Sequence, residues 1–211
     1  MKAVVKSLVE FLALLAVLPA WLLYGVLRLA LGRDRACQAI SQRASRWPGV
    51  GGEYLRSALL RRVVAHVGRG VVISFGSVLT KASARLEDGV YVGSYCLIGD
   101  VRVGRDTLIA DHVLVPSGSR QHEFERLDVP IRQQQGRFET IRIGCDCWIG
   151  SGAIILADVG DHCVVAAGSV VTHPVAEYLV VAGVPAQPIG DRRAQRNEAP
   201  ARLDIRSPGR S

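Results

Sequence analysis

His122 is the residue in this sequence best suited to proton transfer. An imidazole has an unperturbed pKa of about 6.5, so near neutral pH it can both accept a proton and return it. Three acids follow it closely, and any of them could orient the ring through its second nitrogen: Glu123, Glu125 and Asp128. The sequence does not choose among these acids. We predict that His122 is a general base on a loop.

The five cysteines are the other reactive side chains. Cys145 and Cys147 form a C-x-C pair, but no second pair follows at the spacing of a zinc site. Cys96, Cys147 and Cys163 occupy the small positions of the repeat described next. We interpret them as buried packing residues in a reducing compartment, without disulfides and without a metal.

A six-residue repeat must position these side chains. Branched aliphatic residues recur at this spacing, with one shortened step, at Ile143, Ile149, Ile155, Val159, Val165 and Val171. A small residue stands two positions before most of them, and Gly or Ala follows several of them. A spacing of six fits neither a helix nor a simple strand alternation. It fits short parallel strands joined by tight turns, with three strands to a coil.

The same register continues upstream. Its inward positions are Leu86, Val92, Ile98, Val103, Ile109 and Val115, with small partners at Ala84, Cys96 and Thr107. Ile73 and Leu79 fit an incomplete first coil. We predict a mainly β fold, a parallel β-helix over 70–190, interrupted by a loop at 117–140. A loop of this length is usually functional or disordered.

Positive charge is concentrated before the repeat. The chain has 26 basic and 19 acidic residues, a net charge of +7. The segment from Arg28 to Arg69 holds nine arginines and two acids, so it carries this whole excess. No nucleic-acid-binding motif accompanies it. Beside an apolar segment, the arginines favour an anionic membrane surface over nucleic acid.

Residues 1–31 are predicted to hold the protein on a membrane. No charge interrupts the 17 residues from Phe11 to Leu27, which would be roughly 25 Å long as a helix. The run continues past a plausible cleavage point, which disfavours a signal peptide. Pro19 allows either a single span with Met1 outside, which we favour, or a re-entrant hairpin with both ends inside.

Residues 32–69 are predicted to form an amphipathic helical region, and residues 191–211 a disordered tail. The second helix has an aliphatic face, with Leu55, Leu59, Val63 and Val67. Its arginines lie elsewhere, at Arg56, Arg61 and Arg62. Two interpretations stay open for this helix: packing against the first coil, or lying among lipid headgroups.

Three segments between residues 70 and 189 resemble hexapeptide-repeat O-acetyltransferases, especially those of bacterial surface-polysaccharide clusters. The segments are HEFERLDVPIRQQQG, IGCDCWIGSGAIIL, and AAGSVVT followed by AGVPAQPI. In order and spacing they match the family's active-site loop, its Trp-bearing coil and its coenzyme A-binding coils. The resemblance implies a left-handed β-helix, although the connections between parallel strands are usually right-handed. It also implies a homotrimer with each active site between neighbouring prisms.

The resemblance implies roles for individual residues. His122 aligns with the catalytic histidine, which would deprotonate the acceptor hydroxyl. The residues that would bind the coenzyme are Trp148, Ser151, Ala167, Gly168 and Thr172. Ser151 would bond the thioester sulfur or the developing oxyanion, and the small Ala167 and Gly168 would admit the pantetheine arm. Trp148 equally suits packing between subunits.

The chain departs from the family pattern at two positions. Gln187 replaces an arginine, and His173 stands where a lysine near the coenzyme phosphates is common. Both changes put the charge pairing with those phosphates in doubt. His112 and His162 fall in turn positions, where we expect exposed side chains.

The predicted function is acetyl transfer from acetyl-CoA to a hydroxyl of a cell-surface or exopolysaccharide sugar, or of its lipid-linked precursor. Because coenzyme A is cytoplasmic, the enzyme would lie on the cytoplasmic face of the bacterial inner membrane. One alternative is a zinc hydratase of the γ-carbonic-anhydrase type, for which only His112 and His122 are candidate ligands. The other is a non-catalytic membrane-tethered scaffold. The acceptor sugar, the position acylated and the acyl length are not specified by the sequence.

Overall fold

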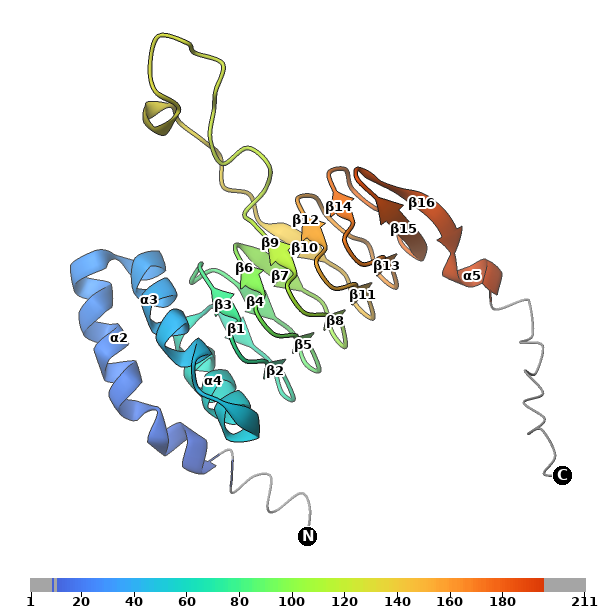
Figure 1. Cartoon of the computed structure of the whole chain (residues 1–211). Helices are drawn as coiled ribbons and strands as arrows, with labels where there is room; N and C mark the ends of the chain where they lie inside the picture. Colours follow the sequence, from blue (N-terminus) through green and yellow to red (C-terminus); the bar gives the residue numbers. More distant parts are fainter. Residues whose placement is uncertain (1–8, 10, 196–211) are drawn as a thin grey trace, which may run out of the picture.

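The computed structural model describes residue 9 and residues 11–195. Helices cover one end of a stack of short strands (Figure 1). The helices are α2 (Leu18–Leu31), α3 (Arg33–Ser45) and α4 (Gly49–Val63). Residues 11–16 are also helical. A short helix, α5 (Arg192–Gln195), lies at the other end.

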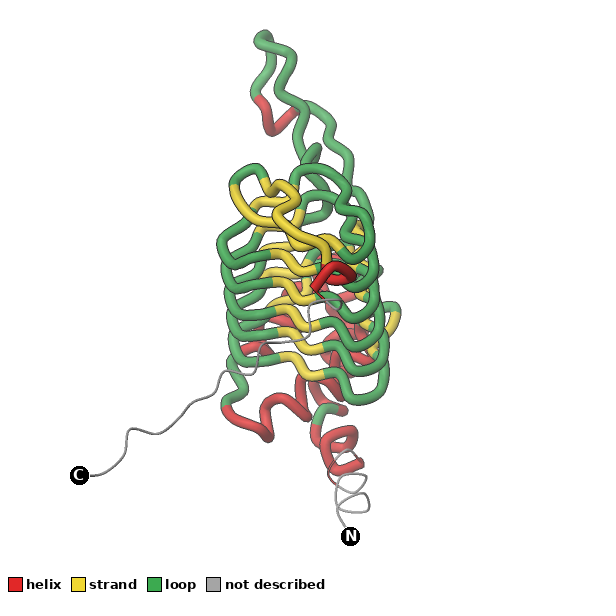
Figure 2. The backbone as a smooth tube through the Cα atoms, turned by 90° about the vertical axis from the view of Figure 1, so that its right-hand side faces the viewer, coloured by secondary structure: helices red, strands yellow, loops and turns green. Residues whose placement is uncertain are grey.

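The strands form three sheets, one on each face of a triangular prism (Figure 2). Sheet A contains β1 (His66–Val67), β4 (Arg85–Leu86), β7 (Val101–Val103) and β10 (Ile141–Ile143). Sheet B contains β2 (Val72–Ile73), β5 (Tyr91–Val92), β8 (Leu108–Ile109), β11 (Trp148–Ile149), β13 (Val164–Val165), β15 (Leu179–Gly183) and β16 (Ala186–Asp191). Sheet C contains β3 (Val78–Leu79), β6 (Leu97–Ile98), β9 (Leu114–Val115), β12 (Ile154–Ile155) and β14 (Val170–Val171).

The six-residue register is confirmed. Every predicted aliphatic residue faces the interior, and each is at most 2% exposed: Leu86, Val92, Ile98, Val103, Ile109, Val115, Ile143, Ile149, Ile155, Val159, Val165 and Val171. All pairs between coils are parallel, and only β15 and β16 pair antiparallel. Burying each such side chain contributes about 1.5–3 kcal/mol. The fold is the predicted left-handed parallel β-helix with helices at its N-terminal end.

The buried cysteines are packing residues, as predicted. All five are free thiols, and Cys96, Cys147 and Cys163 are at most 2% exposed. The thiol of Cys147 donates to the carbonyl of Gly160 at 3.0 Å. Burial raises the pKa of the Cys37 thiol to about 12. Since the thiolate is the reactive form, the Cys37 thiol is unsuited to nucleophilic chemistry.

The first coil begins at β1, ahead of the predicted start at residue 70, and α4 closes its open end. Arg56 was predicted to lie away from the packing face, but it is only 1% exposed. Its Nε donates to the carbonyl of Ile73 at 2.7 Å, and another guanidinium nitrogen donates to Trp47. Beside it, Ser57 donates to Val71 at 2.9 Å. The carbonyls of Val71 and Ile73 lie at the end of the prism and have no further strand to bond, so α4 supplies the donors.

Replacing Arg56 with methionine tests this role. Methionine keeps much of the side-chain volume but leaves two buried carbonyls without a donor, so we expect a loss of about 1–3 kcal/mol in the free energy of unfolding. Thermal denaturation measures the loss. Arg62→Met, at an exposed position on the same helix, loses only a contact with the Trp21 ring and should change stability by less than about 1 kcal/mol. Equal stability of the two variants would contradict the capping role.

The two ends of the chain differ from the sequence-based expectations. Pro19 lies in the first turn of α2, and Val17 is a turn residue between residues 11–16 and that helix. Helical bonds nevertheless continue across this turn, from Val17 to Ala13 at 3.1 Å and from Trp21 to Val17 at 2.9 Å. The predicted disordered tail begins with folded residues, because Asp191 ends β16 and α5 follows. Residues 1–8, 10 and 196–211 lie outside the described residues.

Within the described part of the chain, none of the helices combines the length and the apolar content that crossing a membrane requires.

Candidate functional site

The predicted loop at 117–140 leaves the prism between β9 and β10 and projects away from the coils (Figure 1). Its legs are joined by backbone bonds from Glu139 to Ser117 at 2.9 Å, Arg137 to Arg120 at 2.7 Å and Glu123 to Gln135 at 2.8 Å. Gly136 lies against the other leg, where a Cβ would be only 1.8 Å from the carbonyl oxygen of Gln121. The loop is therefore a paired ribbon up to residue 123, and His122 lies on its paired part.

His122 is exposed on this ribbon and shares a hollow with Arg120, Glu123, Phe124, Glu125 and Arg137. Two of the three acids considered from the sequence therefore lie in the same hollow. The third, Asp128, accepts a hydrogen bond from Nε of Arg126 at 3.1 Å. Bonding to Arg126 lowers the pKa of this carboxyl group. Glu123 and Glu125 are the remaining candidates for orienting the imidazole.

The predicted coenzyme residues lie on the coils. Trp148 is on the outer face of sheet B and is 56% exposed. Ser151 and Gly168 stack on adjacent coils where sheet B meets sheet C, and Gly168 donates its N–H to Ser151 at 2.9 Å. Ala167 lies against Gly150, where a Cβ would be 2.5 Å from the Ala167 nitrogen. The structure thus brings Ser151, Ala167 and Gly168 together at one corner.

This corner includes His112, which the sequence analysis considered only as an exposed turn residue and as a zinc ligand in the alternative function. A left-handed backbone, with φ between 56° and 72°, recurs there at Tyr95, His112, Gly152 and Gly168. Gly152 donates its N–H to Asp111 at 2.9 Å, so His112 lies one coil before Ser151. Its exposed ring stacks on Tyr95 at 5.4 Å. The repeat register could have placed His112 at this corner, because each of these four residues follows an inward aliphatic residue by three positions.

Thr172 lies apart from this corner. It follows β14, whereas Gly168 precedes that strand, so the two residues are at opposite ends of one rung of sheet C. Its hydroxyl is 2.9 Å from Nδ1 of His173. Thr172 is therefore not in the group formed by Ser151, Ala167 and Gly168.

His122 and Trp148 are on different sides of the prism. The loop leaves where sheet C meets sheet A, and Trp148 lies on sheet B, the face opposite that corner. One chain does not bring them together. A site that contains both residues requires the loop of one chain and the coils of another.

A second polar cluster lies where sheet A meets sheet B. Nδ1 of His162 is 3.0 Å from the carboxylate of Asp146, and Arg192 is 3.3 Å from the same carboxylate. The bond to His162, with the charge of Arg192, lowers the pKa of Asp146. His162 was predicted to be exposed, but it is half-buried and stacks on Tyr178 at 4.8 Å. Because these groups pair with one another, we interpret the cluster as fastening the C-terminal hairpin.

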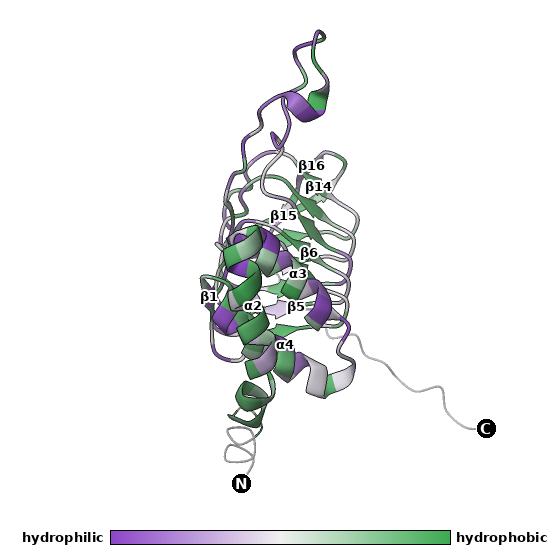
Figure 3. Cartoon of the chain, turned by 90° about the vertical axis from the view of Figure 1, so that its left-hand side faces the viewer, coloured by the Kyte–Doolittle hydropathy of each residue, from purple (hydrophilic) through white to green (hydrophobic). Residues whose placement is uncertain are grey.

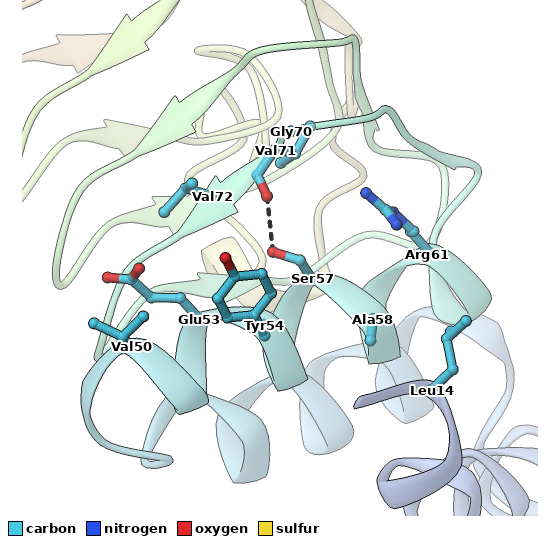
Figure 4. A pocket seen from close by; sticks show the side chains of 10 residues that line it. All are labelled: Leu14, Val50, Glu53, Tyr54, Ser57, Ala58, Arg61, Gly70, Val71 and Val72. Carbon is cyan, nitrogen blue, oxygen red and sulfur yellow. Dashed lines mark hydrogen bonds between the residues drawn. The ribbon is translucent and has the colours of Figure 1, made fainter. Parts of the chain in front are cut away.

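A separate pocket lies at the helical end, between α4 and β2 (Figure 4). Its lining includes Leu14, Tyr54, Ser57, Arg61 and Val72. It contains none of the predicted site residues. Among the residues that the structure describes, no group of three or more His, Cys, Asp or Glu side chains could hold a metal ion.

Comparisons with known proteins agree with this architecture. Residues 140–173 match the family model described as bacterial transferase hexapeptide (six repeats). A maltose O-acetyltransferase from Clostridium difficile 630 is similar at 20% sequence identity, over 77% of this chain and 88% of that chain, with a TM-score of 0.63. A galactoside acetyltransferase in complex with coenzyme A is similar at 20% identity, over 78% of this chain and 83% of that chain, with a TM-score of 0.57. No curated protein sequence matches the chain. Part of the chain therefore matches the hexapeptide repeat, and the chain shares the β-helical fold of these two acetyltransferases.

Proposed function

We propose that this protein transfers an acetyl group from acetyl-CoA to a hydroxyl of a glycan sugar. The observation that carries the proposal is the corner where Ser151, Ala167 and Gly168 meet, although they come from different repeats. The fold shared with two acetyltransferases, one of them in complex with coenzyme A, supports it. The acceptor is a surface polysaccharide, an exopolysaccharide or a lipid-linked precursor.

The corner suits an extended thioester arm. Gly168 has a φ of 69°, and nothing lies within 4 Å of the position a Cβ would take, so its backbone is open to a ligand. The exposed hydroxyl of Ser151 on the neighbouring coil supplies a hydrogen-bond donor for the thioester or the oxyanion. Small residues here let the arm lie directly on the backbone.

In the proposed reaction, His122 accepts the proton of the sugar hydroxyl as that oxygen bonds to the acyl carbon. The carbon–sulfur bond then breaks, and the coenzyme leaves as a thiol after the imidazolium returns the proton. Glu123 or Glu125 orients the ring. The products are the sugar ester and free coenzyme A.

A homotrimer would bring the loop of one chain to the coils of the next. The outward positions of sheets B and C include exposed apolar side chains: Tyr91, Leu97, Leu108, Leu114 and Trp148. The outward positions of sheet A are instead basic: Arg85, Arg102 and Arg142. Apolar rows of this kind favour contact between prisms.

We therefore expect light scattering on the purified full-length protein in detergent to report three chains per particle. A monomer that still transfers acetyl groups would contradict a site shared between chains. The exposed apolar side chains on sheets B and C would then need an explanation other than contact between prisms.

Coenzyme binding tests the proposed function. Gly168→Leu places a side chain where the arm would lie, so we expect at least tenfold weaker binding of coenzyme A by titration calorimetry. Gly70→Leu is the matched control, because Gly70 has nearly the same φ, 68°, and nothing within 4 Å of its Cβ position. Wild-type protein that binds no coenzyme A, or equal affinity of the two variants, would contradict the proposed slot.

A further inference from the structure

The helical segment at 11–31 has two opposite apolar stripes. The inner stripe packs on α3 and α4, and its buried members are Ala13, Val17 and Tyr24, at 6%, 1% and 5% exposure. The hydroxyl of Tyr24 donates to the carbonyl of Val63 on α4 at 3.3 Å. This side fixes how the segment sits on the protein.

The outer stripe has no partner among the described residues. It consists of Phe11, Leu15, Leu18, Leu22, Val26 and Leu29, with exposures of 57%, 50%, 36%, 64%, 64% and 89%. Their spacing of three or four residues places them on one helical face. Figure 3 shows α2 as a mainly hydrophobic helix lying over α3 and α4. A helix exposed to water carries polar residues at such positions, so this face is suited to an apolar surrounding.

Basic and aromatic groups border this stripe. The guanidinium of Arg62 lies 5.4 Å from the centre of the Trp21 ring, and Arg28 lies in the last turn of α2. Arg33 and Arg35 follow. The only acid between residues 11 and 49 is Asp34, and it pairs with Lys81 at 3.0 Å. Tryptophan and arginine at the edge of an apolar face suit the headgroup region of a bilayer.

We propose that α2 docks lengthwise on an anionic lipid bilayer, with the outer stripe among the upper acyl chains and the arginines at the phosphates. Charge complementarity selects lipid over a second copy of the chain. Two copies joined through this stripe would bring Arg28, Arg33 and their neighbours against each other. The prism is then held next to the membrane, close to any acceptor that lies on the same surface. This inference concerns location and does not depend on the proposed chemistry.

Vesicle flotation of the full-length protein tests the docking. Vesicles of phosphatidylcholine alone are compared with vesicles that also contain phosphatidylglycerol. Leu22→Gln with Leu29→Gln removes apolar contact from the stripe, so we expect at least tenfold weaker partition into vesicles. The control, Val184→Gln with Ile189→Gln, changes side chains of similar exposure, 72% and 66%, at the other end of the prism and should partition like the wild type.

A charge variant separates the electrostatic contribution to vesicle binding from the apolar contribution. Arg28→Gln with Arg33→Gln should weaken binding to the anionic vesicles by roughly fivefold for each arginine, and leave binding to neutral vesicles unchanged. Added salt should reduce the same difference. The proposal is overturned if the stripe variant floats like the wild type. It is also overturned if that variant only lowers the number of chains per particle, because the stripe would then join copies.

Discussion

Replacing His122 with alanine is expected to slow acetyl transfer by roughly 10²–10⁴-fold, the usual contribution of a general base. The expected melting temperature is unchanged, because the side chain is exposed on a ribbon outside the packed prism. Release of coenzyme A thiol from acetyl-CoA, in the presence of a membrane glycolipid extract, measures the rate. His66→Ala is a suitable control, since that histidine pairs with Glu87 at 3.5 Å on the first coil.

His112→Ala makes this experiment discriminating. His112 is the histidine that one chain places beside Ser151, so it is the competing candidate for the base. If His112→Ala lowers the rate by the predicted factor and His122→Ala does not, the assignment of the base is wrong. A near wild-type rate for His122→Ala would lead to the same conclusion.

Ile149→Asp is expected to unfold the prism. Ile149 is 0% exposed and lies between Ile109 and Val165 in the parallel ladder. An unpaired carboxylate there costs several kcal/mol, against a total stability of about 5–15 kcal/mol for a typical domain. In a solenoid each coil contacts mainly its neighbours, so a disrupted central coil removes support from both sides.

Circular dichroism and the yield of soluble protein measure this effect. Arg102→Asp is the matched control, because Arg102 precedes the inward Val103 but is itself exposed on sheet A, outside the apolar rows. That variant should keep a cooperative thermal transition. A soluble, cooperatively melting Ile149→Asp protein would show that the inward register is misassigned.

The prism was predictable because its register depends only on neighbouring coils. Most inward aliphatic residues have a small partner two positions earlier and a turn three positions later, so each coil carries its own signal in the sequence. The corner shared by Ser151 and Gly168 follows from the same register. His112 could have been placed there by counting three positions from Ile109.

Contacts beyond the repeat were not predictable in this way. A helical period shows which residues of α4 share a face, but not that Arg56 meets the open end of the first coil. Likewise, the ring of His162 is half-buried against Tyr178, which precedes β15, and Arg192 after β16 donates to the His162 carbonyl. The separation of His122 from Trp148 depends on the corner at which the loop leaves, so it required the folded chain.

The central claim is that the protein uses His122 to place an acyl ester on a glycan. NMR of surface glycan from cells that carry the wild-type gene, the His122→Ala allele or a deletion tests it most directly. We predict that one O-acyl signal is present in the wild type, absent in both mutants, and restored when the wild-type gene is returned. An identical ester content in all three strains would contradict the claim.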